Sequence, residues 1–123
     1  MATQIVIQNG DSILLDQEFK ISWADKGNSM PALPNTIHCV LWNDLPGQNE
    51  IQSKDPATGN MTGNTDLNAT SDAVGSTTVA ALLTWGETRK SQILSAQTAY
   101  DTAVTNGTAS DGETWKDYDS NYS

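Results

Sequence analysis

The sequence predicts an α+β fold: a small N-terminal antiparallel β-sheet, then a long C-terminal helix or helix pair, and a short aromatic terminal helix. Two observations carry this prediction. Residues 3–53 contain short β-rich runs separated by turn formers, which is typical of antiparallel strands. Residues 76–107 instead repeat apolar side chains at steps of three and four, the pattern of an amphipathic helix. We therefore divide the chain into a β-rich subdomain, residues 1–75, and a helical arm and tail, residues 76–123.

The first half is expected to form five strands. Asn9-Gly10 lies between the first two and favours a tight hairpin, because a type I′ turn needs positive φ at both central residues. The third segment alternates apolar and polar side chains, which indicates a half-buried strand. The expected strands are residues 3–8, 12–16, 19–23, 36–43 and 48–53, with at most one further short strand near residues 60–62.

The fourth segment is the most apolar, and both of its faces are largely apolar. This predicts a central strand, or one covered on its second side. Strict alternation assigns Ile37, Cys39 and Leu41 to one face, and His38, Val40 and Trp42 to the other. Turn formers dominate residues 54–75, so we expect a loop there that is long for a compact domain.

The long helical segment can be read as one helix or as two. Asn106-Gly107 is a good stop, because glycine adopts the left-handed cap conformation without strain. Thr84 and Glu87 match a capping box, and Gly86 would weaken a continuous helix by about 1 kcal/mol, so helices over residues 76–83 and 85–105 are the alternative. A single rod of roughly 28 residues would be about 40 Å long. Part of its apolar stripe is then expected to meet another chain.

The tail after this segment contains a second capping-box match, from Ser110 to Glu113. Trp115, Tyr118 and Tyr122 follow at helical spacing and predict a short helix with an aromatic face. These rings could fold back on the long helix or contact a partner, and the sequence leaves both open.

Composition argues against several classes of function. A net charge of −9 with only six basic residues disfavours binding to nucleic acid or to anionic membranes. A single cysteine, Cys39, excludes an intrachain disulfide and an ordinary thiolate zinc cluster. No apolar run approaches a membrane span and no basic segment opens a secretory signal, so we expect a protein made and kept in a cytoplasm-like compartment, or delivered by a route other than secretion.

Chemistry-bearing motifs are weak throughout. His38 is the only histidine and could act as a general base, but no nucleophile motif accompanies it. Asp117, Asp119 and Asn121 resemble the beginning of a calcium loop, which also needs a glycine at its sixth position and a glutamate at its twelfth. The chain ends before such a loop is complete. We therefore predict no cofactor, no metal site and no enzymatic activity.

The segment of residues 84–94, TWGETRKSQIL, carries a family resemblance. It resembles small tail proteins of tailed bacteriophages, some of them tail-fibre assembly proteins, in which a Trp opens a helix and an Arg and a Leu follow. Trp85, Arg89 and Leu94 match this pattern, and Trp115 with Tyr118 matches a second Trp-x-x-Tyr near the C-terminus. Residues 37–43 are similar to a β segment of small marine and cyanobacterial phage proteins.

The resemblance loosely covers residues 36–118. The chain departs from it after Tyr118, where the family usually has basic and apolar residues and this sequence is acidic and polar.

The resemblance implies a protein-binding role without catalysis: a virion structural protein of the tail or tail-fibre apparatus, made in the host cytoplasm. Its partners would be other tail or fibre proteins in a homo- or hetero-oligomer. The alternatives are a fibre-assembly chaperone not kept in the particle, and a small enzyme centred on His38. We expect Trp85→Ala to weaken association more than folding. The expected partner interface comprises Trp85, Arg89, Ile93, Leu94, Tyr100, Trp115, Tyr118 and Tyr122.

Overall fold

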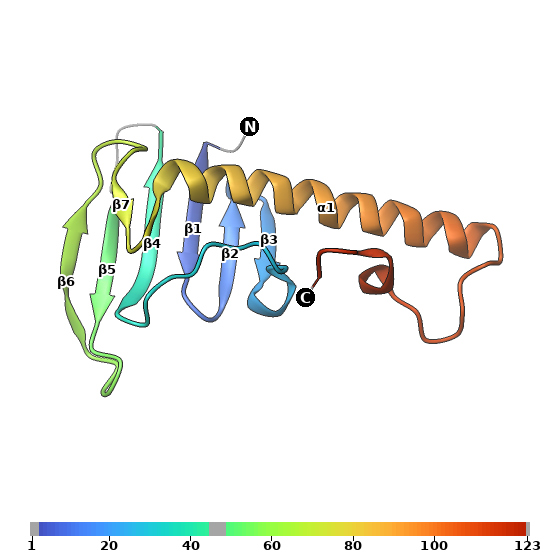
Figure 1. The fold of residues 1–123 in the computed structure, drawn as a ribbon, viewed down its shortest axis with the longest axis horizontal. Helices are drawn as coiled ribbons and strands as arrows, with labels where there is room; N and C mark the ends of the chain where they lie inside the picture. The colour runs from blue at the N-terminus through green and yellow to red at the C-terminus, as the bar shows by residue number, and fades with distance from the viewer. Residues whose placement is uncertain (1–2, 45–48, 123) are drawn as a thin grey trace.

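A computed structural model describes residues 3–44 and 49–122 and has an α+β fold, as the sequence predicts (Figure 1). A six-stranded antiparallel sheet has the order β3-β2-β1-β4-β5-β6, and a long helix crosses one of its faces. A small β7-β8 hairpin precedes the helix, and two short 3-10 helices, η1 and η2, complete the chain. The elements are β1 Gln4–Gln8, β2 Ser12–Leu15, β3 Phe19–Ser22, η1 Trp23–Asp25, β4 Ile37–Asn43, β5 Glu50–Lys54, β6 Met61–Asp66, β7 Ala73–Val74, β8 Thr77–Thr78, α1 Val79–Thr105 and η2 Trp115–Tyr118.

The core face of the sheet is a ladder of branched aliphatic side chains. Strand pairing aligns Ile21, Ile13, Ile7, Val40 and Ile51 in one row across five strands, and all five are buried. β-Branched residues suit this surface because their side chains pack well on a pleated, covered sheet. The helix supplies the opposite side of the same hydrophobic cluster, so sheet and helix share one core.

A bulge in β4 changes the faces that simple alternation predicts. Ile37 pairs with Ser53, whereas Cys39 already pairs with Gln52, so His38 is an extra residue in this strand. Such an insertion shifts the side-chain alternation by one position. The grouping of Ile37 with Cys39 was therefore wrong: Ile37 belongs to the same core cluster as Val40 and Trp42, and Cys39 does not.

The helical segment forms one continuous helix of 27 residues, which settles the alternative of two helices. Its N-cap is Thr78, whose hydroxyl accepts a hydrogen bond from the Ala81 N–H. Gly86 does not break the helix, because it allows a close approach to the sheet. A Cβ at this position would lie 2.7 Å from Cδ2 of Leu15, too close for any ordinary contact.

The strand β6 is longer than the sequence predicts. It pairs with β5 over its whole length, from Lys54 opposite Met61 to Glu50 opposite Asp66. Every residue of β6 is exposed, so neither face needs apolar side chains and no alternation marks the strand in the sequence. The predicted long loop is shortened accordingly, and Leu67 and Val74 beyond β6 are buried in the core.

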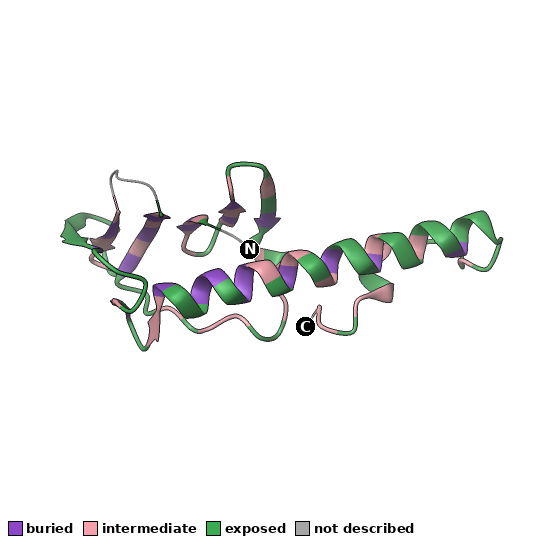
Figure 2. Cartoon of the chain, turned by 90° about the horizontal axis from the view of Figure 1, so that it is seen from above, coloured by how far each residue is buried: buried purple, intermediate pink, exposed green. Residues whose placement is uncertain are grey.

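The helix is longer than the sheet is wide. Its N-terminal part covers the middle strands, and its C-terminal part extends past β3 (Figure 1). Burial follows this arrangement: buried positions concentrate in the first half of α1, and exposed positions dominate towards its end (Figure 2). The chain then turns back, so that η2 and the residues after it lie along the projecting part of α1. We call this projecting part, residues 91–105, the helical arm.

Candidate functional site

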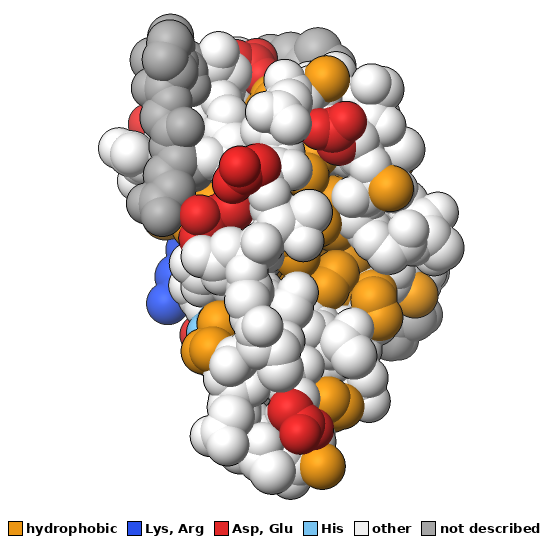
Figure 3. Space-filling view, turned by 90° about the vertical axis from the view of Figure 1, so that its left-hand side faces the viewer, with side chains coloured by type: hydrophobic (Ala, Val, Ile, Leu, Met, Phe, Trp, Pro, Cys, Tyr) orange, Lys and Arg blue, Asp and Glu red, His pale blue; other side chains and the backbone are white. Residues whose placement is uncertain are grey.

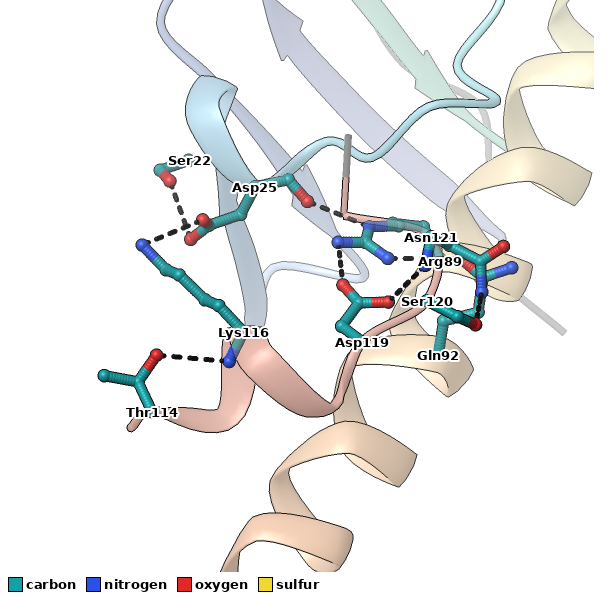
Figure 4. A network of polar contacts seen from close by, with 9 residues as sticks. All are labelled: Ser22, Asp25, Arg89, Gln92, Thr114, Lys116, Asp119, Ser120 and Asn121. Atoms are coloured by element: carbon teal, nitrogen blue, oxygen red, sulfur yellow. Dashed lines mark hydrogen bonds and ion pairs between the residues drawn. The ribbon is translucent and has the colours of Figure 1, made fainter. Parts of the chain in front are cut away.

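The most elaborate polar site of the molecule is a buried joint between α1, η1 and the tail, centred on Arg89 (Figure 4). The Arg89 side chain is completely buried and donates three hydrogen bonds. Nε donates to the carbonyl of Asp25 at 2.9 Å, one terminal nitrogen donates to Gln92 at 3.2 Å, and the other donates to Asp119 Oδ2 at 2.6 Å. We call this group, with Asn121, the Arg89 joint. It ties together residues that are far apart in the sequence.

Asp119 is held as an anion in this joint. Its side chain is only 1% exposed. Burial raises the pKa of this carboxyl, but the bonds from Arg89 and from the Asn121 N–H outweigh burial and leave the pKa below its ordinary value of 3.8. A buried carboxylate next to a buried guanidinium is stable only when both are hydrogen-bonded, as they are here.

The backbone around Gly27 completes the joint. The Asn28 N–H donates to the Asn121 carbonyl at 3.0 Å, which fastens the tail to the loop after η1. Gly27 has φ +82°, and a Cβ there would lie 2.8 Å from both Arg89 Nε and the Asn121 oxygen. Glycine is therefore required for its backbone conformation and for the space that Arg89 occupies.

An aromatic cluster surrounds the second, more exposed ion pair of the tail. Lys116 Nζ lies 3.4 Å from Asp25 Oδ1 and stands over the rings of Trp115 and Tyr122, at 5.9 and 5.3 Å from their centroids. Those two rings make an edge contact with each other at 6.1 Å. Tyr118 makes a similar contact with Tyr100 of the helix at 5.8 Å. The tail aromatics thus fold back on the chain itself, one of the two alternatives that the sequence left open.

The helix at the C-terminus is short, and it begins later than the sequence predicts. Its capping box is formed by Thr114 and Asp117. The predicted box at Ser110 and Glu113 instead makes a turn, in which the Ser110 N–H donates to Glu113 at 2.7 Å.

Three residues assigned to a partner interface lie inside the chain. Trp85 and Ile93 belong to the hydrophobic core, at 6% and 4% exposure, and Arg89 is fully buried in its joint. Trp85 thus packs inside the chain and not on an exposed face, so the relative cost of Trp85→Ala for folding and for association stays a prediction. Leu94 differs, because it is 43% exposed on the helical arm. Tyr100, Trp115, Tyr118 and Tyr122 are partly exposed and contact one another as described.

Several residues of the joint were not foreseen from the sequence. Asp25 and Gly27 were assigned to a loop, and Asp119 was considered only as part of an incomplete calcium loop. The one available signal was Arg89 itself, a cation on a helix face between Trp85 and Ile93. A buried arginine requires acceptors from elsewhere in the chain.

The groove beside the joint is polar and shallow in character. A cavity of about 660 Å³ lies between α1 and the tail and is lined by small and polar side chains, among them Glu87, Ser91, Ser95 and Ala99. His38 lies on β4, away from this groove. Within residues 3–44 and 49–122, no three His, Cys, Asp or Glu side chains converge as a set of metal ligands.

The described helices include none that combines the length and the apolar composition required to span a bilayer. Comparison of the chain with models of protein families, with curated proteins and with solved structures finds no match.

Proposed function

We propose that the chain is a structural protein of a phage tail or tail-fibre apparatus, and that it acts by binding other proteins. The observation that carries this proposal is the helical arm, which projects from the packed α+β body (Figure 1) and has an exposed leucine, Leu94. Val104 near its end is also exposed, at 52%. The resemblance of residues 84–94 to small phage tail proteins supports the same reading.

The Arg89 joint supports a mechanical role for the arm. A helix of this length would be marginal without tertiary contacts. Here the returning tail packs on it and is fixed by a buried ion pair, and Ile93, Ala96 and Ala103 of the arm are buried. The arm is therefore a braced element, as binding through a preformed surface requires, because an ordered surface loses less conformational entropy on association.

The test is quantitative mass spectrometry of particles purified from the phage that encodes the chain. A structural protein is detected in a fixed ratio to the known tail proteins, and this ratio survives a high-salt wash. A protein abundant in the lysate and absent from the particle is a fibre-assembly chaperone, and that result would overturn the structural role.

A matched pair of variants connects the result to the arm. Leu94→Glu places a charge on the exposed leucine and should lower the amount of protein in the particle while leaving the melting temperature of the purified chain unchanged. Ala57→Glu introduces the same carboxylate in the exposed turn between β5 and β6 and should be incorporated normally. Equal incorporation of both variants would show that Leu94 makes no contact in the particle.

A further inference from the structure

The sheet has two free edges, and the backbone of each has hydrogen-bonding groups directed outwards. Next to β3, the Trp23 N–H donates to the carbonyl of Asp11, which immediately precedes β2. Because hydrogen-bonded positions alternate along an antiparallel pair, the N–H and C=O groups of Lys20 and Ser22 point away from β2. At β6, the Leu67 N–H donates to Asn49, so Asn64 and Asp66 are directed away from β5 in the same way. Such edges are templates for pairing with another strand.

The two edges fit each other. All neighbouring strands are antiparallel, so β3 and β6 run in opposite directions. A copy placed beside the first one, with the same face of its sheet towards the helix, therefore adds its β6 antiparallel to β3. The sheet would continue from one copy to the next.

Charge selects the register of this pairing. On the sheet face opposite the helix, one row of paired residues begins with Lys20 on β3 and ends with Glu50 on β5 and Asp66 on β6. Its continuation places Asp66 of one copy next to Lys20 of the other, and Asn64 next to Ser22. Opposite charges directly across a strand pair are stabilising. Within one chain, Asp66 lies opposite the like-charged Glu50, and the proposed pairing adds Lys20 on its other side.

The charge distribution of the two ends agrees with this fit. Acidic side chains predominate over basic ones at the β6 end of the molecule (Figure 3). At the β3 edge, Lys20 lies on the strand and Lys90 stands over the ring of Phe19, whereas Arg89 and Lys116 are already paired within the chain.

The helical arm provides the second half of the fit. Gly86 packs on Leu15 of β2, and Lys90, one turn later, stands over the ring of Phe19 of β3 at 5.6 Å. Leu94 is the next residue at this spacing, so it faces the position one strand beyond β3. Four helical residues advance about 6 Å, close to the 4.7–4.9 Å between strands. The tail lies on the flank of α1 opposite the sheet (Figure 2).

We propose that a second copy of this chain docks its β6 along the edge of β3, beneath the helical arm and in contact with Leu94. Each copy has both edges, so the contact is head-to-tail and builds a ring or a filament. On the face of β6 that continues the core face of the sheet, Gly63 has no side chain and Thr65 has a small one, so little bulk lies between this strand and the arm. This inference goes beyond the virion role and does not depend on it, because the purified chain suffices to test it.

The test is sedimentation velocity of the purified chain over a range of concentrations, with five variants. Lys20→Glu and Asp66→Lys should each weaken association about three- to tenfold, because each replaces an attraction with a repulsion. The double variant Lys20→Glu, Asp66→Lys should regain most of the lost association. Leu94→Glu should also weaken it, and Val104→Glu, with the same new charge at the far end of the arm, should not. Thermal melts check that each variant is folded.

Amide hydrogen exchange provides an independent measurement on the wild-type chain. The amides of Lys20, Ser22, Asn64 and Asp66 should gain protection together as concentration rises. Three results would overturn the proposal: a chain that remains monomeric at high concentration, a double variant no better than the single ones, or protection confined to β6, which indicates a symmetric pairing of two β6 strands. The amount of the wild-type chain in purified particles is measured separately from these outcomes, so failure here and failure of the virion role are distinguishable.

Discussion

Replacing Arg89 by methionine isolates the energy of the buried joint. Methionine keeps much of the unbranched stem and removes the charge and all three hydrogen bonds. The Asp119 carboxylate, 1% exposed, is left without its cation. Breaking one half of a buried pair costs about 3–5 kcal/mol. Asp119 could lose its buried charge by binding a proton. Protonating a carboxyl of ordinary pKa 3.8 at neutral pH costs about 4 kcal/mol, at 1.36 kcal/mol per unit. We therefore expect Arg89→Met to lower the free energy of unfolding by about 3–4 kcal/mol.

The ion pair of Lys116 is the matched control, because it joins the same tail to the same loop. Lys116 is 44% exposed, so solvent screens the pair and Lys116→Met should cost far less than Arg89→Met. Urea unfolding followed by tryptophan fluorescence measures both variants. Arg89→Met combined with Asp119→Leu should recover most of the loss, because neither buried charge then remains. An Arg89→Met loss no larger than that of Lys116→Met, or a double variant as unstable as the single one, would refute this reasoning.

Three further predictions concern titration, packing and thiol chemistry. Because the pKa of Asp119 is lowered from 3.8 in the folded chain, its contribution to stability is complete above pH 3.8 and is lost as the pH falls through the lower folded value. Acid titration should therefore expose Trp115 before global unfolding, as measured by fluorescence quenching, and Asp119→Asn should abolish this early step. Gly27→Ala combines backbone strain with two 2.8 Å contacts and should lower the free energy of unfolding by about 2–4 kcal/mol. Gly59 has φ +77° and open space around it, so Gly59→Ala should cost only about 1 kcal/mol. Urea melts compare the two variants, and equal losses would contradict the packing argument. Burial, and next the charge of Glu50, raise the pKa of the Cys39 thiol, so its reaction with a disulfide reagent at mildly alkaline pH should be slow and should accelerate with urea in step with unfolding; fast labelling of the folded chain would show that the strand opens locally.

The parts of the fold that sequence predicts well are those where a covered face imposes a period. The strands before residue 44 and the helix of residues 79–105 show that period clearly, and their approximate bounds follow from it. The strand β6 has no covered face, so nothing in its composition distinguishes it from a loop. The bulge at His38 escapes prediction for another reason: both faces of β4 are apolar, so a shift of one residue leaves the pattern equally acceptable.

The candidate site was harder to predict, because its contacts join segments that are distant in the sequence. The sequence pattern of the amphipathic stripe that contains Trp85 and Ile93 does not depend on whether a sheet, a returning tail or a partner covers it. Only the fold shows that the first two do so. Leu94 follows Ile93 directly but lies on a different side of the helix. It stays exposed, whereas Trp85 and Ile93 are buried.

The anchored tail also decides where the end of the chain is found. Asn121 is bonded to Asn28 and to the joint, so the last described residue, Tyr122, lies near β3 and not at the tip of the long helix (Figure 1). A fluorophore attached at Tyr122 would therefore lie close to that edge of the sheet. The same group inserted at Gly107, which has open space around it, would be carried at the opposite extremity.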